Sequence, residues 1–315
     1  MLTAYKMEKN YLERLSSSTE SNRLEAAVWI ELINPTAEEI KTVEVSTGIS
    51  LPNVQETEEL EASSHYEVYL TGFQINCSFL LKSEKTYSNV NVAFLCNAKC
   101  LISLSTCEIP AIRLLQKQWQ KTPRLNSDPV STIIALHEIK IDKLADLSEG
   151  AHLSIEKISH QIFERANSDL EETIDDLSRQ DDLNGKIRLC LMDGQRDLNF
   201  LLRRGQLDPD NFKSSNDMQE DIKTLLTHNT FLSERIDFLL NAALGFINIE
   251  QNKIIKIFSI AAVVLMPPTV IASIYGMNFH FMPELSWPWG YPLSLLLMLS
   301  AGISPYIYFK RKGWL

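Results

Sequence analysis

The sequence has no even set of cysteines that could pair completely, and its first residues form no apolar leader. Both absences bear on the cellular compartment in which the chain folds. Its 315 residues include an odd set of five cysteines: Cys77, Cys96, Cys100, Cys107 and Cys190. The first residues, Met1 to Lys6, contain no apolar run of the kind that a secretory signal needs. We therefore expect reduced thiols and a cytoplasmic location for most of the chain. A zinc site at Cys96 and Cys100 is disfavoured, because no second cysteine or histidine pair lies nearby.

A positive charge excess is also absent. The formal net charge is -10 and the pI is near 5.2, whereas a nucleic-acid-binding surface normally needs a basic patch. The sequence contains no P-loop, glycine-rich nucleotide fingerprint or nucleophile elbow, which argues against an enzyme and against a nucleotide partner. The histidines of the predicted helices are too scattered for a catalytic set, and we expect stalk or surface positions for them: His137, His152, His160 and His228.

Two long apolar runs lie near the end of a chain whose average composition resembles that of a soluble protein. The mean hydropathy is only -0.08, but residues 257–274 and 291–309 contain no charged side chain. Each run can cross a hydrocarbon core of about 30 Å as a helix. Pro267 and Pro268 lie inside the first run, which a spanning helix tolerates better than a soluble core helix does. The sequence therefore predicts two membrane spans, at about 257–276 and 291–309, joined by the loop 279–290.

The basic residues near the two runs predict their orientation. Lys253 and Lys256 precede the first run, and Lys310, Arg311 and Lys312 follow the second, whereas the loop 279–290 contains no lysine or arginine. The positive-inside rule then places both termini in the cytoplasm and the short loop outside.

The region before the spans divides into two parts by its hydrophobic period. Residues 1–130 hold short runs rich in β-branched and aromatic residues, with a helical segment at Ala37 to Val45, so we expect an α/β domain with a mixed or mainly antiparallel sheet. Residues 131–253 change to steps of three and four, which predict long helices. A first helical stripe runs from Ile141 to Leu177, a second helix is expected at about 183–204, and a third runs from about Asp217 to Gly276. Residues 254–315 form the transmembrane domain.

Acidic residues gather on the helical part. One face carries Asp169, Glu171, Glu172, Asp175, Asp176, Asp181 and Asp182. A solvated helix face accounts for these charges, and a shell that attracts cations is the functional alternative.

The first span carries a stripe of small and polar residues at steps of three or four, which could line a pore. Its members are Asn252, Ile255, Phe258, Ala262, Met266, Thr269 and Ser273, and it leads to Gly276. A seam for helix packing explains the same spacing equally well. Because one hairpin cannot enclose a pore, conduction would require several copies around an axis.

Specific segments of the chain resemble the CorA family of magnesium transporters, in particular its gamma-proteobacterial members. Gly276-Met277-Asn278 closes the first span, Met282-Pro283-Glu284-Leu285 follows in the loop, and Lys-Arg-Lys-x-Trp-Leu ends the chain. The resemblance runs nearly the whole length, from Met1-Leu2-Thr3-Ala4 through the segment 186–193, and is densest from Ala243 to Phe279.

The resemblance implies a homopentamer in the bacterial inner membrane, with a funnel-shaped cytoplasmic domain, that carries Mg²⁺, Co²⁺ and in some members Ni²⁺. Gly276, Met277 and Asn278 would form the outer selectivity filter, and Ile255 and Phe258 a hydrophobic gate. Bound cytoplasmic Mg²⁺ would close the channel, with Asp217, Glu220 and Asp221 as the candidate regulatory ligands. His280 stands at a commonly acidic position, which leaves Glu284 as the only carboxylate of the loop.

Two other functions remain open from the sequence. A Zn²⁺ or broader divalent exporter could use the same architecture, although a lining poor in soft ligands favours hard cations. A membrane-anchored scaffold could use the long helices to organise partners, but it would not need a polar stripe that meets Gly-Met-Asn.

Overall fold

The computed structural model describes residues 1–8, 11–15, 24–52, 66–70, 72–83, 86–121, 128–164, 170–204, 207–278, 280 and 282–313, without the side chain of residue 285. Two compact units divide the chain, Met1–Leu240 and Asn241–Leu315. Asp169, Phe279 and the final Trp-Leu pair of the tail lie outside the described residues.

A seven-stranded mixed sheet organises the first unit, in the order β2-β1-β3-β7-β6-β5-β4. Its strands are β1 (Leu2–Glu8), β2 (Tyr11–Arg14), β3 (Trp29–Ile33), β4 (Tyr66–Val68), β5 (Gly72–Ser83), β6 (Thr86–Asn97) and β7 (Leu101–Ser105). Every paired neighbour is antiparallel except β3 and β7, which pair in parallel, with Ile30 opposite Ile102. The expectation of a mixed, mainly antiparallel sheet is confirmed.

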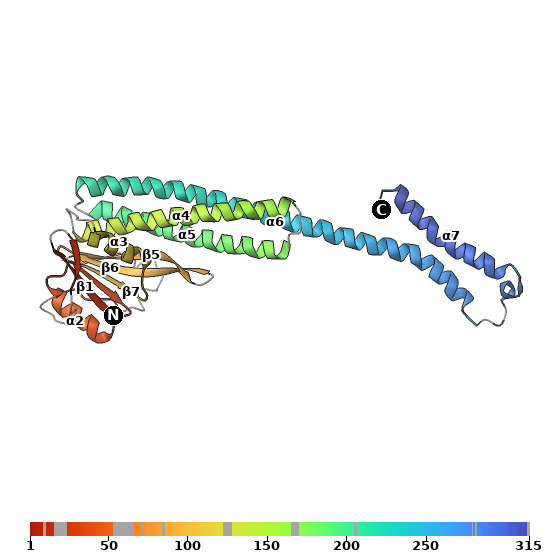
Figure 1. Ribbon diagram of the computed structural model, residues 1–315, viewed down its shortest axis with the longest axis horizontal. Helices are drawn as coiled ribbons and strands as arrows, with labels where there is room; N and C mark the ends of the chain where they lie inside the picture. Colours follow the sequence, from red (N-terminus) through yellow and green to blue (C-terminus); the bar gives the residue numbers. More distant parts are fainter. Residues whose placement is uncertain are drawn as a thin grey trace. The chain divides into compact units, whose positions relative to one another are not determined.

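Helices cover both faces of this sheet (Figure 1). The helix α2 (Ala37–Thr47) begins with a capping box between Thr36 and Glu39, and its buried Val43 joins a core cluster with Ile30 and Leu32 of β3. The alternate residues of β3 point to the other face, where Trp29 meets Trp119 of α3 (Pro110–Lys121) edge to face. Strand alternation therefore divides the core between two helical layers.

Two long helices pack on the α3 side of the sheet, α4 (Pro129–Glu164) and α5 (Leu170–Arg204). The sequence prediction of a helix boundary between residues 177 and 183 is wrong, because α5 is continuous through that segment. The five residues 178–182 are all polar, Ser-Arg-Gln-Asp-Asp, which interrupts the apolar stripe without breaking the helix. The strands β1 and β2 and the helix α3 were also not predicted from the sequence.

The helix α6 (Pro209–Tyr275) has 67 residues, belongs to both units, and contains Pro267 and Pro268. After it come a 3-10 turn η2 (Pro283–Ser286) and the helix α7 (Gly290–Arg311). Both α6 and α7 are long and apolar enough to cross a membrane, and only 6% of the most apolar 18-residue stretch of each is buried. A core helix of a soluble protein would be mostly buried, so these stretches fit lipid or a neighbouring chain better.

Candidate cation pathway

The predicted pore stripe is an exposed face of α6 in the second unit. Phe258, Met266 and Ile255 are 72%, 64% and 60% exposed, which is far more than a core side chain would be. The other predicted members of the stripe are exposed as well: Asn252, Ala262, Thr269 and Ser273. The stripe is therefore not used to pack α7 against α6 in the single chain.

A shallow groove follows the outer half of this face. It is lined by Ala262, Leu265, Met266, Thr269, Val270, Ser273, Ile274 and Met277. Four predicted lining residues and one predicted filter residue are thus brought together. Asn252, Ile255 and Phe258 lie earlier on α6, outside this groove.

The two hydroxyl groups of the groove are held in one orientation by the helix backbone. Thr269 Oγ1 donates to the Leu265 carbonyl and Ser273 Oγ donates to the Thr269 carbonyl, each at 2.8 Å. Each hydroxyl proton is therefore occupied, and the oxygen lone pairs remain as acceptors. Such acceptors suit a hydrated cation, whose water molecules all donate outwards.

The helix ends where the predicted filter begins. The amide of Gly276 donates to the Ala272 carbonyl at 3.0 Å, and the amide of Met277 donates to the Ile274 carbonyl at 3.3 Å. A Cβ atom added at Gly276 would lie 3.2 Å from the Ala272 oxygen, so this tight last turn favours glycine. The final carbonyl groups and the helix dipole give this end a partial negative charge, which stabilises a cation. Asn278 follows directly and is exposed.

The loop after the filter is tied to the start of α7. A Cβ atom at Gly290 would lie 2.1 Å from the Glu284 carbonyl oxygen, so only glycine permits this approach. Glu284 and His280 are both exposed. Trp287 and Trp289 are also exposed, as expected for side chains at a membrane interface.

Pro268, the second of the two prolines in α6, lies close to α7. Pro268 has no N–H, so it cannot donate to the Val264 carbonyl one turn earlier. Gly302 of α7 faces this position, because a Cβ atom added there would lie 3.2 Å from Pro268 Cγ and 3.5 Å from the Val264 oxygen. A glycine therefore allows the second span to cover the interrupted turn of the first.

The first unit contains an acidic cleft that includes two of the three predicted regulatory residues. Its lining residues come from α4 and α6: Glu138, Ile141, Asp142, Asp210, Lys213, Ser214, Asp217, Met218 and Asp221. Glu220 does not line the cleft, and its Oε1 lies 3.0 Å from Lys223 Nζ. Glu138 and Asp142 were missed from the sequence, although their spacing of four places both on one helix face.

Comparisons with known proteins agree with this architecture. A family model described as "CorA-like Mg2+ transporter protein" matches residues 25–311. The magnesium transport proteins CorA of Salmonella typhimurium and of Escherichia coli K12 are each 41% identical to this chain over 317 residues, with 100% of both chains covered.

Solved structures share the fold at low sequence identity. The complete CorA magnesium transporter from Methanocaldococcus jannaschii has a TM-score of 0.76 at 18% identity, covering 100% of this chain and 99% of that one. The full-length CmaX protein has a TM-score of 0.72 at 15% identity, covering 99% and 97%. The similarity thus includes the sheet domain, the long helices and both candidate spans.

Proposed function

This chain belongs to the CorA-like Mg²⁺ transporter family, and from this membership we propose that it conducts Mg²⁺ across a bacterial inner membrane through a pore shared by identical subunits. The observation that carries the proposal is the exposed groove of α6, which leads directly to Gly276, Met277 and Asn278. The proposed substrates also include Co²⁺ and Ni²⁺.

The proposed assembly is a homopentamer in which each chain contributes one α6 helix to the pore. Two helices cannot enclose a channel, and the polar face of α6 is exposed in the single chain. In an assembly with closed cyclic symmetry, the exposed α6 faces of identical subunits meet around one axis. They then enclose a channel and are no longer exposed to lipid. Residues 1–130 and 131–253 would form the cytoplasmic α/β and helical parts, and 254–315 the membrane domain, with both termini inside.

The proposed filter acts on hydrated Mg²⁺. This ion loses water reluctantly and prefers octahedral oxygen ligands. A ring of Asn278 amides beside the α6 carbonyl ends can hydrogen-bond the hydration shell without replacing it. A ring of carboxylates would hold the ion more tightly and slow its release, whereas Glu284 lies outside the filter in the loop.

The remaining assignments follow the chain inwards from the filter. Ser273, Thr269 and Met266 would line the outer pore, Ala262 would allow close helix approach, and Phe258 with Ile255 would form the apolar gate. Asn252 would lie at the cytoplasmic entrance. Closure is proposed to follow from cytoplasmic Mg²⁺ bound near Asp217 and Asp221, with Glu138 and Asp142 of α4 as additional ligands.

Flux measurements on Asn278→Ala test the filter assignment. The change removes one amide from every subunit, and five hydrogen bonds of about 0.5 kcal/mol each would sum to about 2.5 kcal/mol. We expect Mg²⁺ flux into proteoliposomes to fall by at least about tenfold while the mass of the detergent-solubilised assembly stays five times 35.9 kDa. Asn216→Ala, the same substitution at an exposed site of α6, is the matched control.

Three results would contradict the proposal: one from the Asn278→Ala variant and two from the wild-type protein. If an assembled Asn278→Ala variant kept the wild-type flux, Gly276-Met277-Asn278 would not be the filter. A conducting monomer or dimer would exclude the shared pore. Transport of Zn²⁺ that exceeds Mg²⁺ transport and depends on a pH gradient would favour the divalent exporter instead.

A further inference from the structure

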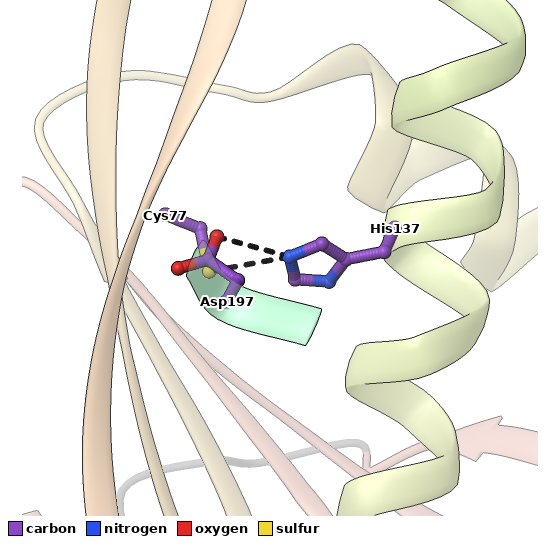
Figure 2. Close-up of side chains that lie close together, drawn as sticks. All are labelled: Cys77, His137 and Asp197. Atoms are coloured by element: carbon purple, nitrogen blue, oxygen red, sulfur yellow. Dashed lines mark hydrogen bonds and ion pairs between the residues drawn. The ribbon is translucent and has the colours of Figure 1, made fainter. Parts of the chain in front are cut away.

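Three buried side chains that are distant in the sequence meet between the sheet and its helical layer. Cys77 lies on β5, His137 on α4 and Asp197 on α5, and each is no more than 1% exposed (Figure 2). His137 Nε2 lies 3.0 Å from Asp197 Oδ2 and 3.9 Å from Cys77 Sγ. One ligand atom from each side chain lies within 4.8 Å of the others. We refer to these residues as the Cys77 cluster.

The orientation of the His137 ring is set by the backbone of its own helix. Its Nδ1 lies 2.9 Å from the Ile133 carbonyl oxygen. Because a carbonyl can only accept, Nδ1 must carry hydrogen and donate it. The other nitrogen, Nε2, is thereby directed at the sulfur and the carboxylate. Histidines that bind metals characteristically donate their second ring nitrogen to a carbonyl or carboxylate in this way.

The two distances from His137 Nε2 to the other ligand atoms are close to those around a tetrahedral metal ion. Bond lengths of about 2.3 Å to sulfur, 2.05 Å to nitrogen and 2.0 Å to oxygen place sulfur and nitrogen about 3.6 Å apart, and nitrogen and oxygen about 3.3 Å apart. The separations here are 3.9 Å and 3.0 Å. Each differs by about 0.3 Å from the tetrahedral value, which small side-chain rotations can supply.

The charges around the cluster balance with a divalent ion in place. Lys140 Nζ lies 3.1 Å from Asp193 Oδ2 and 3.9 Å from Asp197 Oδ2. A divalent cation, the Cys77 thiolate, two aspartates and Lys140 sum to zero with a neutral His137. A divalent ion at this position is therefore compensated by the buried charges around it.

We propose that the Cys77 cluster binds one Zn²⁺ or similar transition-metal ion within the cytoplasmic part of the chain. A thiolate and an imidazole are ligands for zinc and cobalt, whereas Mg²⁺ requires oxygen. Three protein ligands leave the fourth tetrahedral position to water. The ion would join β5, α4 and α5. The site is separate from the Mg²⁺ pathway and does not depend on the proposed pore.

A Co²⁺ titration of the full-length protein in detergent tests this site, with excess Mg²⁺ present to saturate oxygen-only sites. We expect one Co²⁺ per chain to produce a thiolate-to-cobalt charge-transfer absorption, and one equivalent of Zn²⁺ to abolish it. Cobalt bound in an oxygen-lined pore cannot produce this band, so the readout is specific for the cysteine ligand. Cys77→Ala should lose the band, and Asp197→Asn should weaken Co²⁺ binding by at least tenfold.

The control is Cys100→Ala, which removes another buried thiol, directly before β7, and should retain the band. Absence of the band in the wild-type protein would overturn the proposal by itself, so the test does not depend on the folding of any variant. Retention of the band in Cys77→Ala would equally overturn it, because another cysteine would then be the ligand. Mg²⁺ flux, measured on the same samples, reports separately on the transport function.

Discussion

Asn184 of α5 and Asn229 of α6 exchange hydrogen bonds inside the helical layer of the first unit. The side-chain Nδ2 of Asn184 donates to the main-chain carbonyl of Asn229 at 3.0 Å, and Nδ2 of Asn229 donates to the main-chain carbonyl of Asn184 at 2.7 Å. Both side chains are buried. A reciprocal polar pair in an apolar interface aligns the two helices in one register, because any axial shift would leave both amides unsatisfied.

Replacing one partner of this pair should therefore reduce the free energy of unfolding more than replacing both. Asn229→Leu removes the Nδ2 group that donates to the main-chain carbonyl and Oδ1 of Asn184, so Asn184 Oδ1 is left buried without this donor. The free energy of unfolding should fall by about 1–3 kcal/mol. The double variant Asn184→Leu/Asn229→Leu should recover part of that loss, since the buried Asn184 amide that lost its donor is then removed as well. Thermal unfolding of the detergent-solubilised protein, with exposed Asn216→Ala as the control, measures the difference. Equal or additive losses would mean that the pair does not act as a unit.

The close approach of the two spans at Gly302 should be sensitive to a single methyl group. A Cβ atom there meets Pro268 Cγ at 3.2 Å, so Gly302→Ala should press α7 away from α6 and lower the yield of assembled protein. Gly302→Val should lower it further. Gly150→Ala is the control, because Gly150 lies in α4 with nothing within 4 Å of the added atom, and alanine is there the better helix former. An assembly yield equal to that of the wild type for Gly302→Val would show that the spans separate without cost.

The acidic cleft predicts which carboxylates act in regulation. Asp217 and Asp221 line it, whereas Glu220 is paired with Lys223 elsewhere on α6. Millimolar Mg²⁺ should protect the first unit from proteolysis, and Asp217→Asn/Asp221→Asn should remove at least half of that protection. Glu220→Gln should leave it unchanged. Full protection in the double variant would show that the regulatory site is not this cleft. The acidic face of α5 would then be the next candidate.

The environment of Glu39 predicts that the folded protein loses stability in mild acid. Partial burial by itself would raise the pKa of this carboxyl, but hydrogen bonds from the Thr36 and Leu2 amides and the Met1 amino group hold the pKa below 4.5. Because the folded state then binds fewer protons than the unfolded state, the contribution is complete above pH 4.5 and is lost as the pH falls through the folded pKa.

Glu39→Gln should therefore be less stable than the wild type at pH 7, by less than about 1 kcal/mol because Glu39 is largely screened by solvent. The difference should shrink below pH 4.5. Thermal midpoints of both proteins across this range measure the difference. Glu38→Gln is the control, because Glu38 is an exposed carboxylate in the same first turn of α2. A constant difference at every pH would assign the effect to packing instead of charge.

Local patterns were enough to predict the two spans and most of the long helices. Hydropathy acts residue by residue along a helix, so the uncharged run at 257–274 already indicates a membrane environment. The helix predicted at Ala37 is confirmed as well, because capping signals depend on neighbours within four residues. The Gly276-Met277-Asn278 assignment rests on resemblance and stays a prediction.

Only the tertiary structure decided which distant residues meet. β3 pairs in parallel with β7 although about 70 residues separate them, and no local signal encodes that partner. His137 was expected at a stalk or surface position, yet it is buried beside Asp197 because the face of α4 that carries it packs on the sheet. Glu138 and Asp142 join the cleft of α6 through the same packing of helices. Each of these contacts depends on how whole elements stack, and that depends on the combined burial of side chains from several segments at once.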